Sequence, residues 1–109
     1  MQRNADDMGY PSPVTPKPKT RQVVHKKVVQ PGELIQFPIG AEVLTAHEQR
    51  GQFCIWYKCD PYNAGQSDPS REYAIYGTGH HMLEAEHRYI SSVFLENGDL
   101  VLHLFEIMR

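Results

Sequence analysis

The stretch Tyr89-Ile-Ser-Ser-Val-Phe-Leu-Glu-Asn-Gly-Asp-Leu-Val-Leu-His-Leu-Phe-Glu-Ile107 decides the fold, because it has the pattern of a single β-hairpin. Its Asn97-Gly98 dipeptide is the preferred centre of a type I′ turn, and apolar runs flank the dipeptide on both sides. We therefore predict antiparallel pairing outward from the turn, in the register Glu96–Asp99, Leu95–Leu100, Phe94–Val101, Val93–Leu102 and Ser92–His103.

Both faces of this predicted hairpin are apolar. One face is expected to carry Tyr89, Val93, Leu95, Leu100, Leu102 and Leu104. The other is expected to carry Ile90, Phe94, Val101, Phe105 and Ile107. A hairpin with two apolar faces has to be covered on both sides, by the rest of the domain or by another chain. We therefore predict self-assembly or a protein partner, with Phe94, Val101, Phe105 and Ile107 as candidate interface residues.

The same pattern of short β-branched and aromatic runs between turn residues extends back from the hairpin to Gln22. It predicts strands at residues 23–29, 34–37, 42–47, 53–58 and 72–76, with a hairpin turn around Gly51 and a long polar loop over 60–71. Residues 81–87 contain no glycine or proline, and one short helical turn is expected there. The predicted fold class is all-β, a small antiparallel sandwich or barrel of six or seven strands.

The N-terminal segment has a different composition. Residues 11–20 contain four prolines, which remove backbone donors and fix φ, so residues 1–21 are predicted to form a flexible or extended arm before a single β domain at 22–109. Residues 1–27 hold six basic and two acidic side chains, a balance of +4, whereas residues 28–109 hold five basic and eleven acidic ones, a balance of −6. This arrangement argues against a body that binds nucleic acid electrostatically.

The basic arm has two possible targets, phosphate groups or an acidic protein surface. Lys17, Lys19 and Arg21 are candidate contacts to an acidic surface, such as the body of a neighbouring subunit. An extended arm of about twenty residues spans on the order of 60 Å, enough to cross such a subunit. Residues 1–10 have no apolar run typical of a signal peptide, and no stretch is apolar enough to span a membrane, so a cytoplasmic protein is expected.

Cys54 and Cys59 are the only cysteines, and both fall in one predicted strand. Five residues apart on a strand, they point to opposite faces and lie roughly 16 Å apart, too far for a disulfide. We predict two free thiols.

The segment Tyr76, Gly77, Thr78, Gly79 and His80 is the candidate binding site, because a Gly-x-Gly turn at a strand end can direct backbone N–H groups at an anion. The alternative is a tight turn that needs a positive φ at one or both glycines. The motif has neither the following glycine of a dinucleotide fingerprint nor the lysine of a phosphate loop.

Three other side chains form a candidate metal site. If residues 80–87 are helical, His80, Glu84 and His87 share one face at i, i+4 and i+7. This spacing matches no known metalloenzyme signature, so we expect neither a metal nor another cofactor.

No enzyme signature was found in the sequence. It has no Gly-x-Ser-x-Gly and no His-Glu-x-x-His motif. The predicted Ser92–His103 pair is more typical of a hydrogen-bonded pair in a sheet than of a catalytic dyad. We therefore expect no enzymatic activity, and an enzyme that uses the region 80–87 is a third, less favoured hypothesis.

Several short segments resemble a small uncharacterised domain family found mainly in phages and prophages. They are residues 37–44 (Phe-Pro-Ile-Gly-Ala-Glu-Val-Leu), the strand around Trp56, residues 75–80 (Ile-Tyr-Gly-Thr-Gly-His) and residues 101–106 (Val-Leu-His-Leu-Phe-Glu). The resemblance covers the body and implies a phage setting without a known activity. In that family the residue after the motif histidine is usually not histidine, so His81 looks particular to this chain.

Taken together, these features predict a non-enzymatic phage or prophage accessory protein that acts by binding, as a virion or assembly component. The alternative is an inhibitor of a host system that binds a host protein or sequesters a nucleotide-like signal. The expected location is the host cytoplasm, with possible incorporation into the virion.

Overall fold

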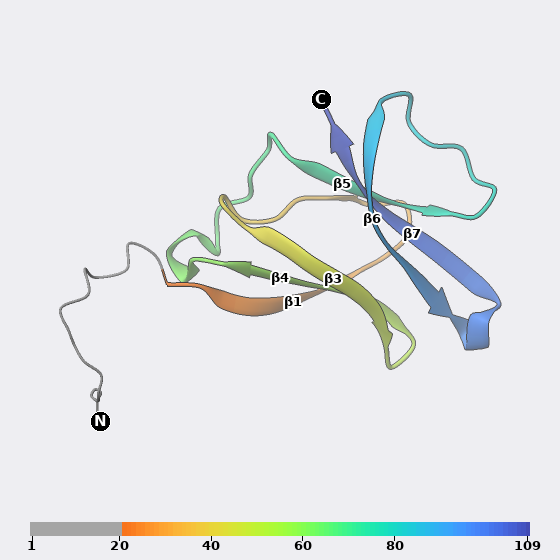
Figure 1. The fold of residues 1–109 in the computed structure, drawn as a ribbon. Coiled ribbons are helices and arrows are strands. Elements are labelled where there is room, and N and C mark those ends of the chain that lie inside the picture. The colour runs from red at the N-terminus through yellow and green to blue at the C-terminus, as the bar shows by residue number, and fades with distance from the viewer. Residues whose placement is uncertain (1–20) are drawn as a thin grey trace.

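The computed structural model describes residues 21–109 as seven strands in two antiparallel sheets (Figure 1). The three-stranded sheet has the order β1-β4-β3, with β1 at Val23–Val29, β3 at Glu42–Gln49 and β4 at Gln52–Cys59. The four-stranded sheet has the order β2-β5-β7-β6, with β2 at Leu34–Ile35, β5 at Glu72–Gly77, β6 at Glu86–Leu95 and β7 at Leu100–Met108. The predicted all-β antiparallel sandwich is confirmed.

Short 3-10 turns, η1 at Pro61–Asn63 and η2 at Glu96–Gly98, are the only helical elements of the described part. No helix among the described residues is long and apolar enough to cross a membrane. The arm predicted at residues 1–21, with Lys17 and Lys19, lies outside the described residues, apart from Arg21, which is exposed.

The β6–β7 hairpin has the predicted turn centre and, from Leu95–Leu100 outward, the predicted register; the predicted Glu96–Asp99 pair is absent from the ladder, because Glu96 has φ 51° and belongs to the turn. Asn97 (φ 57°, ψ 31°) and Gly98 (φ 90°) have the positive φ values of a type I′ turn, and the Asp99 amide donates to the Glu96 carbonyl at 3.0 Å. The predicted strand pairs, from Leu95–Leu100 to Ser92–His103, are all present.

One detail of the hairpin was predicted wrongly. The register shifts between Tyr89 and Ser91, so that Tyr89 pairs with Phe105 on the outer face while Ile90 packs against the core. The predicted faces of Tyr89 and Ile90 are therefore exchanged. The physical reason is a β-bulge, which adds one residue to a strand and reverses the alternation beyond it.

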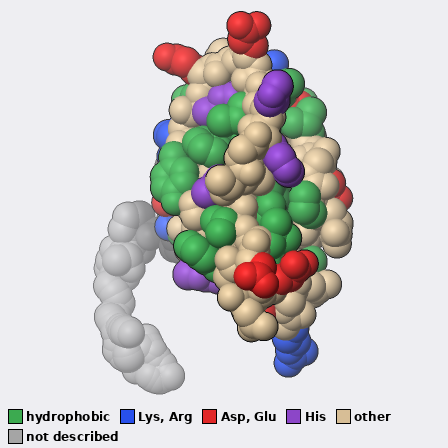
Figure 2. Space-filling model, turned by 90° about the vertical axis from the view of Figure 1, so that its right-hand side faces the viewer, with side chains coloured by type: hydrophobic (Ala, Val, Ile, Leu, Met, Phe, Trp, Pro, Cys, Tyr) green, Lys and Arg blue, Asp and Glu red, His purple; other side chains and the backbone are tan. Residues whose placement is uncertain are grey.

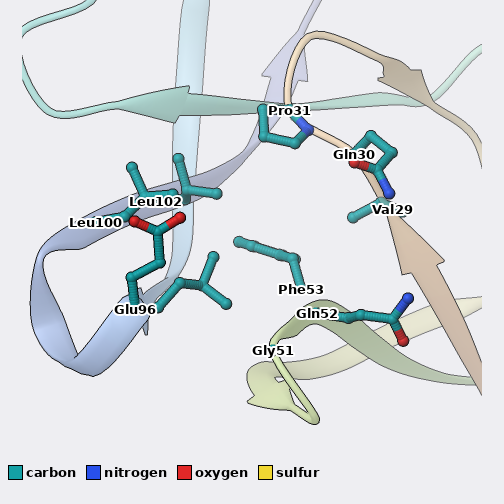
Figure 3. A pocket seen from close by; sticks show the side chains of 10 residues that line it. Val29, Gln30, Pro31, Gly51, Gln52, Phe53, Glu96, Leu100 and Leu102 are labelled. Carbon is teal, nitrogen blue, oxygen red and sulfur yellow. The ribbon is translucent and has the colours of Figure 1, made fainter.

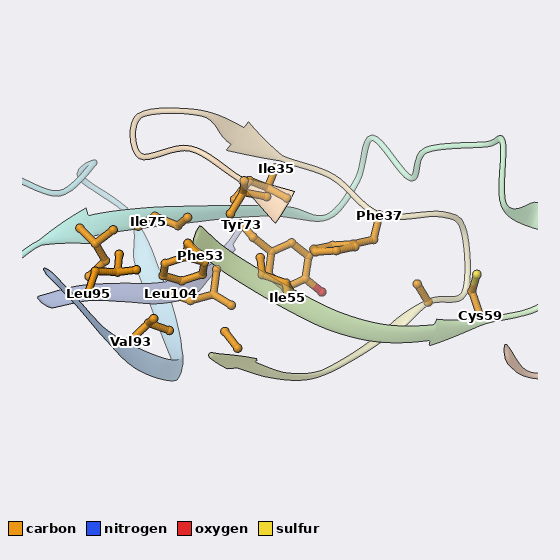
Figure 4. Packing of buried hydrophobic residues seen from close by; sticks show 14 residues of the cluster. Ile35, Phe37, Phe53, Ile55, Cys59, Tyr73, Ile75, Val93, Leu95 and Leu104 are labelled. Carbon is orange, nitrogen blue, oxygen red and sulfur yellow. The ribbon is translucent and has the colours of Figure 1, made fainter. Parts of the chain in front are cut away.

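The core lies between the two sheets, and the large buried side chains come from both (Figure 4). They include Ile35, Phe37, Phe53, Ile55, Tyr73, Ile75 and Leu104. Phe37 and Tyr73 pack edge to face with ring centroids 5.1 Å apart. Burying a large apolar side chain fully is worth about 1.5–3 kcal/mol, so this layer is the main source of stability.

The sandwich is joined at one corner, where β3 and β6 lie side by side. The Ser91 hydroxyl donates to the Ala46 carbonyl at 3.3 Å, which links the two sheets directly. Both strands are irregular near this corner, β3 between Val43 and Thr45 and β6 between Tyr89 and Ser91. Bulges bend and twist strands, so these irregularities fit strands at the corner of a sandwich.

The helical turn expected at residues 81–87 is absent, and that prediction was wrong. The chain runs as a loop to Ala85, and β6 begins at Glu86. His87 and Arg88 pair with Ile107 and Glu106 of β7, and this non-local ladder replaces a local helix. The second predicted strand is also shorter, because β2 ends at Ile35 and Pro38 forms only an isolated bridge with Ser67.

Cys54 and Cys59 are both free and buried, as predicted. Cys59 belongs to the core cluster, and Cys54 faces the other side of β4.

Glu106 is a buried carboxylate in an otherwise apolar layer, with 5% of its surface exposed. Arg71 binds it through two hydrogen bonds of 2.8 and 3.1 Å, and Arg88 binds it from β6. The hydrogen bonds from Arg71 are the largest effect that lowers the pKa of Glu106, against the opposing effect of burial; Arg88 adds to the lowering. Glu106 thereby links β7 to β6 and to Arg71, which directly precedes β5.

Replacing Glu106 with glutamine should lower the free energy of unfolding by about 2 kcal/mol near neutral pH, because two guanidinium groups lose their charged acceptor. The folded-state pKa of Glu106 is lowered, so its contribution exists above the ordinary glutamate pKa and is lost as pH falls through the folded value. Denaturant unfolding over a pH series should show the difference between Glu106→Gln and wild type shrinking toward acid.

The matched control is Glu42→Gln, which breaks the exposed pair with Lys58 and should change stability by no more than about 0.5 kcal/mol. Equal effects of the two substitutions would contradict the role assigned to Glu106.

Candidate functional site

The outer face of the four-stranded sheet, which points away from the core, carries exposed apolar side chains. Strand pairing places Phe94 beside Val101 and Tyr89 beside Phe105. Phe94 is 63% exposed and Tyr89 is 56% exposed. Figure 2, which views the molecule from the side at the right of Figure 1, shows hydrophobic and histidine side chains together in the middle, with acidic side chains above and below them. We call Tyr89, Phe94, Val101 and Phe105 the outer-face patch.

The predicted interface residues of the hairpin differ in how much of their surface is exposed. Phe94 is exposed, and Val101 and Phe105 are half-buried. Ile107 is only 3% exposed, between its neighbours Glu72 on β5 and His87 on β6. Ile107 therefore offers little surface to a partner, unlike the other three predicted interface residues of the hairpin.

An aromatic cluster lies beside the patch. The Phe105 ring is in edge contact with His87 and Tyr89, at centroid distances of 5.7 and 5.6 Å. Tyr76 packs edge-on against His87 at 5.4 Å. Such contacts add about 0.5–1.5 kcal/mol per aromatic pair beyond the area they bury, so these rings hold one another in place.

Hydrogen bonds fix the orientation of His87. Its Nδ1 lies 2.9 Å from the Ala85 carbonyl, so Nδ1 carries the proton and donates. The other ring nitrogen, Nε2, then accepts from the Tyr76 hydroxyl at 3.0 Å, and the Leu83 amide donates to that hydroxyl at 3.3 Å. This chain of bonds attaches the loop before β6 to the sheet, and it occupies both nitrogens of His87.

A second polar chain crosses the same face. His103 Nδ1 lies 2.7 Å from the Ser92 hydroxyl and its Nε2 lies 2.8 Å from the Thr78 hydroxyl. Ser92 also bonds the Tyr89 hydroxyl at 2.8 Å. The predicted Ser92–His103 hydrogen bond is confirmed. Among residues 21–109, no carboxylate bonds His103, so the orienting group of a Ser-His-Asp arrangement does not contact it.

The segment Tyr76 to His80 forms a tight turn. The His80 amide donates to the Gly77 carbonyl at 3.0 Å, and Gly79 has φ +86°, which confirms the predicted positive φ. A Cβ at Gly77 would lie 2.7 Å from His80 Nδ1, so Gly77 is needed for the close approach of the His80 ring. The five residues of the predicted binding site therefore do not form one site. The Tyr76 and Thr78 hydroxyls take part in the hydrogen bonds of the outer face, whereas Gly77 and His80 face a groove.

This groove, which we call the β5-edge groove, has a volume of about 410 Å³. The turn before β2 and the start of β2 form one wall, and His80, His81 and Leu83 form the other. Ile75, Tyr76 and Gly77 of β5 line it between these walls. Sequence reasoning found Tyr76, Gly77 and His80 but missed the contribution of residues 31–34, because no local pattern connects the two segments.

A second hollow lies at the end of the sandwich, beside the tips of the two hairpins (Figure 3). Phe53, Leu100 and Leu102 line it together with Glu96, and its volume is about 180 Å³. Ligand sites commonly enclose about 300–1,000 Å³, so the β5-edge groove is the better candidate for a ligand site.

The described residues contain no group of three or more histidine, cysteine, aspartate or glutamate side chains placed to hold a metal ion. The expected helical face of His80, Glu84 and His87 does not form, because Glu84 lies in the loop and His87 lies on β6.

The fold and its surfaces define a small antiparallel β-sandwich with an apolar outer face and a groove at one sheet edge. Residues 20–109 match the model of a domain of unknown function, DUF7352, and the chain belongs to this family. Comparison with curated proteins and comparison with solved structures found no match.

Replacing Gly79 with alanine should lower stability by about 1 kcal/mol or more, because an L side chain is strained at φ +86°. Gly65→Ala is the matched control, since Gly65 has no positive φ and a Cβ there meets nothing within 4 Å. Thermal unfolding of both variants measures the difference. Equal midpoints for Gly79→Ala, Gly65→Ala and wild type would contradict the turn assignment.

Proposed function

We propose that this protein is a non-enzymatic phage or prophage accessory protein that acts by binding other protein chains, as a component of a virion or of its assembly. The phage setting rests on the family resemblance of residues 37–44, 75–80 and 101–106. The binding role rests on one observation, the outer-face patch with its two exposed aromatic rings.

The patch has the properties of a binding surface. Tyrosine is enriched at the energetic centres of protein interfaces, and large apolar groups presented on a rigid element lose little entropy on binding. The Tyr89 side chain is held by Phe105 and by the Ser92 hydroxyl, and Phe94 stands on a paired strand. The patch is therefore organised before a partner arrives.

Charge favours a second copy of the chain as the partner. The arm, residues 1–21, carries a balance of +2 and the body, residues 22–109, a balance of −4, so the arm of one copy is complementary in charge to the body of another. Four carboxylates at or near the ends of β6 and β7 form no salt bridge with any other described residue: Glu84, Glu86, Glu96 and Asp99. Lys17, Lys19 and Arg21 of a neighbouring copy would supply partners for such carboxylates.

The alternative is an inhibitor of a host system, which binds a host protein or sequesters a nucleotide-like signal. The β5-edge groove supports it, because its volume of about 410 Å³ falls in the usual range of ligand sites. The two proposals use different surfaces, and variants in each surface separate them.

Replacing Phe94 with serine should weaken self-association at least about tenfold without loss of folding, because the ring is largely outside the core. The matched control is Tyr62→Ser, since Tyr62 is 91% exposed on η1, away from the patch. Sedimentation velocity over a concentration series gives the association constants. A wild-type chain that stays monomeric at high concentration, and is absent from particles and pull-downs, would contradict the proposal.

Deleting residues 1–21 should leave a folded body that associates more weakly. Raising the salt concentration should weaken the full chain more than the truncated one, because only the full chain has the arm charges to screen. Circular dichroism checks the fold, and sedimentation at low and high salt measures association. Identical salt dependence of the two proteins would exclude an electrostatic role for the arm.

A further inference from the structure

The four-stranded sheet has an incomplete edge. All six residues of β5, from Glu72 to Gly77, pair with β7. On the other side, β2 pairs only with Tyr73 and Ala74. Within residues 21–109, Ile75, Tyr76 and Gly77 therefore have a strand partner on one side only. In an antiparallel ladder the bonding direction alternates, so Ile75 or Tyr76 directs both its N–H and its C=O to the open edge.

The chain leaves this edge open because of the turn that precedes β2. Gly32 has φ +93°, and the Glu33 amide approaches the Gln30 carbonyl at 3.4 Å. This turn carries the chain from β1, in the other sheet, into β2, so β2 cannot extend alongside Ile75 and Tyr76. The space that remains is the β5-edge groove of about 410 Å³.

Each side wall of the groove carries one exposed leucine. Leu34 is 56% exposed on one wall, and Leu83 is 51% exposed on the other. Leu83 is held in place, because its amide donates to the Tyr76 hydroxyl. An apolar side chain placed between the two leucines would bury surface on both of them.

The lining of the groove offers an anionic ligand no permanent positive charge. Among the described residues, Glu33 is part of the lining, no lysine or arginine is, and His80 and His81 are the only side chains there that can carry a positive charge. A phosphate-bearing ligand would normally meet at least one cation or a helix N-terminus. A peptide needs neither, since its main chain bonds an open sheet edge directly.

We propose that the β5-edge groove binds an extended segment of a partner protein, which adds to the sheet as a short strand beside Ile75 and Tyr76. Main-chain hydrogen bonds supply affinity in such a complex, and an apolar side chain between Leu34 and Leu83 supplies selectivity. The segment has no proline where it faces the open edge, because proline lacks the required N–H. The groove lies along β5 and β2 whereas Phe94 is on β6, so binding there does not require the outer-face patch.

The test is selection of a displayed library of random heptapeptides against the full-length chain. Selected peptides should shift the NMR amide signals of Ile75, Tyr76 and Gly77 and slow the exchange of the edge amide. N-methylation of the peptide nitrogen that faces the edge should weaken binding at least about tenfold, because it removes a donor and keeps the side chains.

A matched pair of variants locates the site. Leu83→Ser should weaken peptide binding, and Leu44→Ser should not, since Leu44 is similarly exposed at 43% but lies on β3 of the other sheet. The Phe94→Ser variant should bind the selected peptides normally, which keeps this result distinct from the self-association test.

Three outcomes would overturn the proposal. In the first, the selection enriches no peptide sequence. In the second, the selected peptides shift the protein's amide signals at Phe94 or along β1 instead of along β5. In the third, the N-methylated peptides bind as tightly as the unmodified ones. ATP serves as the nucleotide probe, and shifts at Ile75 to Gly77 with ATP but not with peptides would assign the groove to a nucleotide.

Discussion

β7 is paired along both of its edges, with β5 on one side and β6 on the other, and this position constrains the rest of the four-stranded sheet. A strand bonded on both sides has only its two faces left for side chains. The inward face supplies Leu102 and Leu104 to the core and ends at Glu106, whose carboxylate binds Arg71 and Arg88. A buried charge needs such partners, and here they come from the residue directly before β5 and from β6.

The outward face of the same strand carries the surface chemistry. Val101, His103 and Phe105 alternate with the core residues, and each meets a side chain of β6 or of the loop before it. Hydrogen bonds on His87 and His103 fix the loop and the rings, so both histidines organise the surface. A binding surface whose side chains are already ordered loses less entropy when a partner docks. The edge of β5 beside the groove offers a different mode of recognition, because β2 leaves part of it without a strand partner among the described residues and the two leucines beside it are exposed.

Local patterns accounted for much of this arrangement. Alternation predicted the opposite faces of Cys54 and Cys59, and the Asn97-Gly98 turn predicted the register of the hairpin. The same reasoning failed at Tyr89, because a bulge depends on how β6 meets β3 at the corner of the sandwich. It also failed at residues 81–87, where pairing with β7 replaced the expected helical turn. In both places a contact between distant segments outweighed a weak local preference.

The sequence by itself determined most of the strands, the Asn97-Gly98 turn and the apolar character of both hairpin faces, because turn chemistry and two-residue alternation act between near neighbours in the chain. Only the tertiary structure decided which side chains meet. Thr78 and His103 are 25 residues apart, and residues 31–34 face residues 80–83 across the groove only after both sheets have formed. Contacts of this kind arise from the packing of two sheets, and no local pattern of residues encodes them.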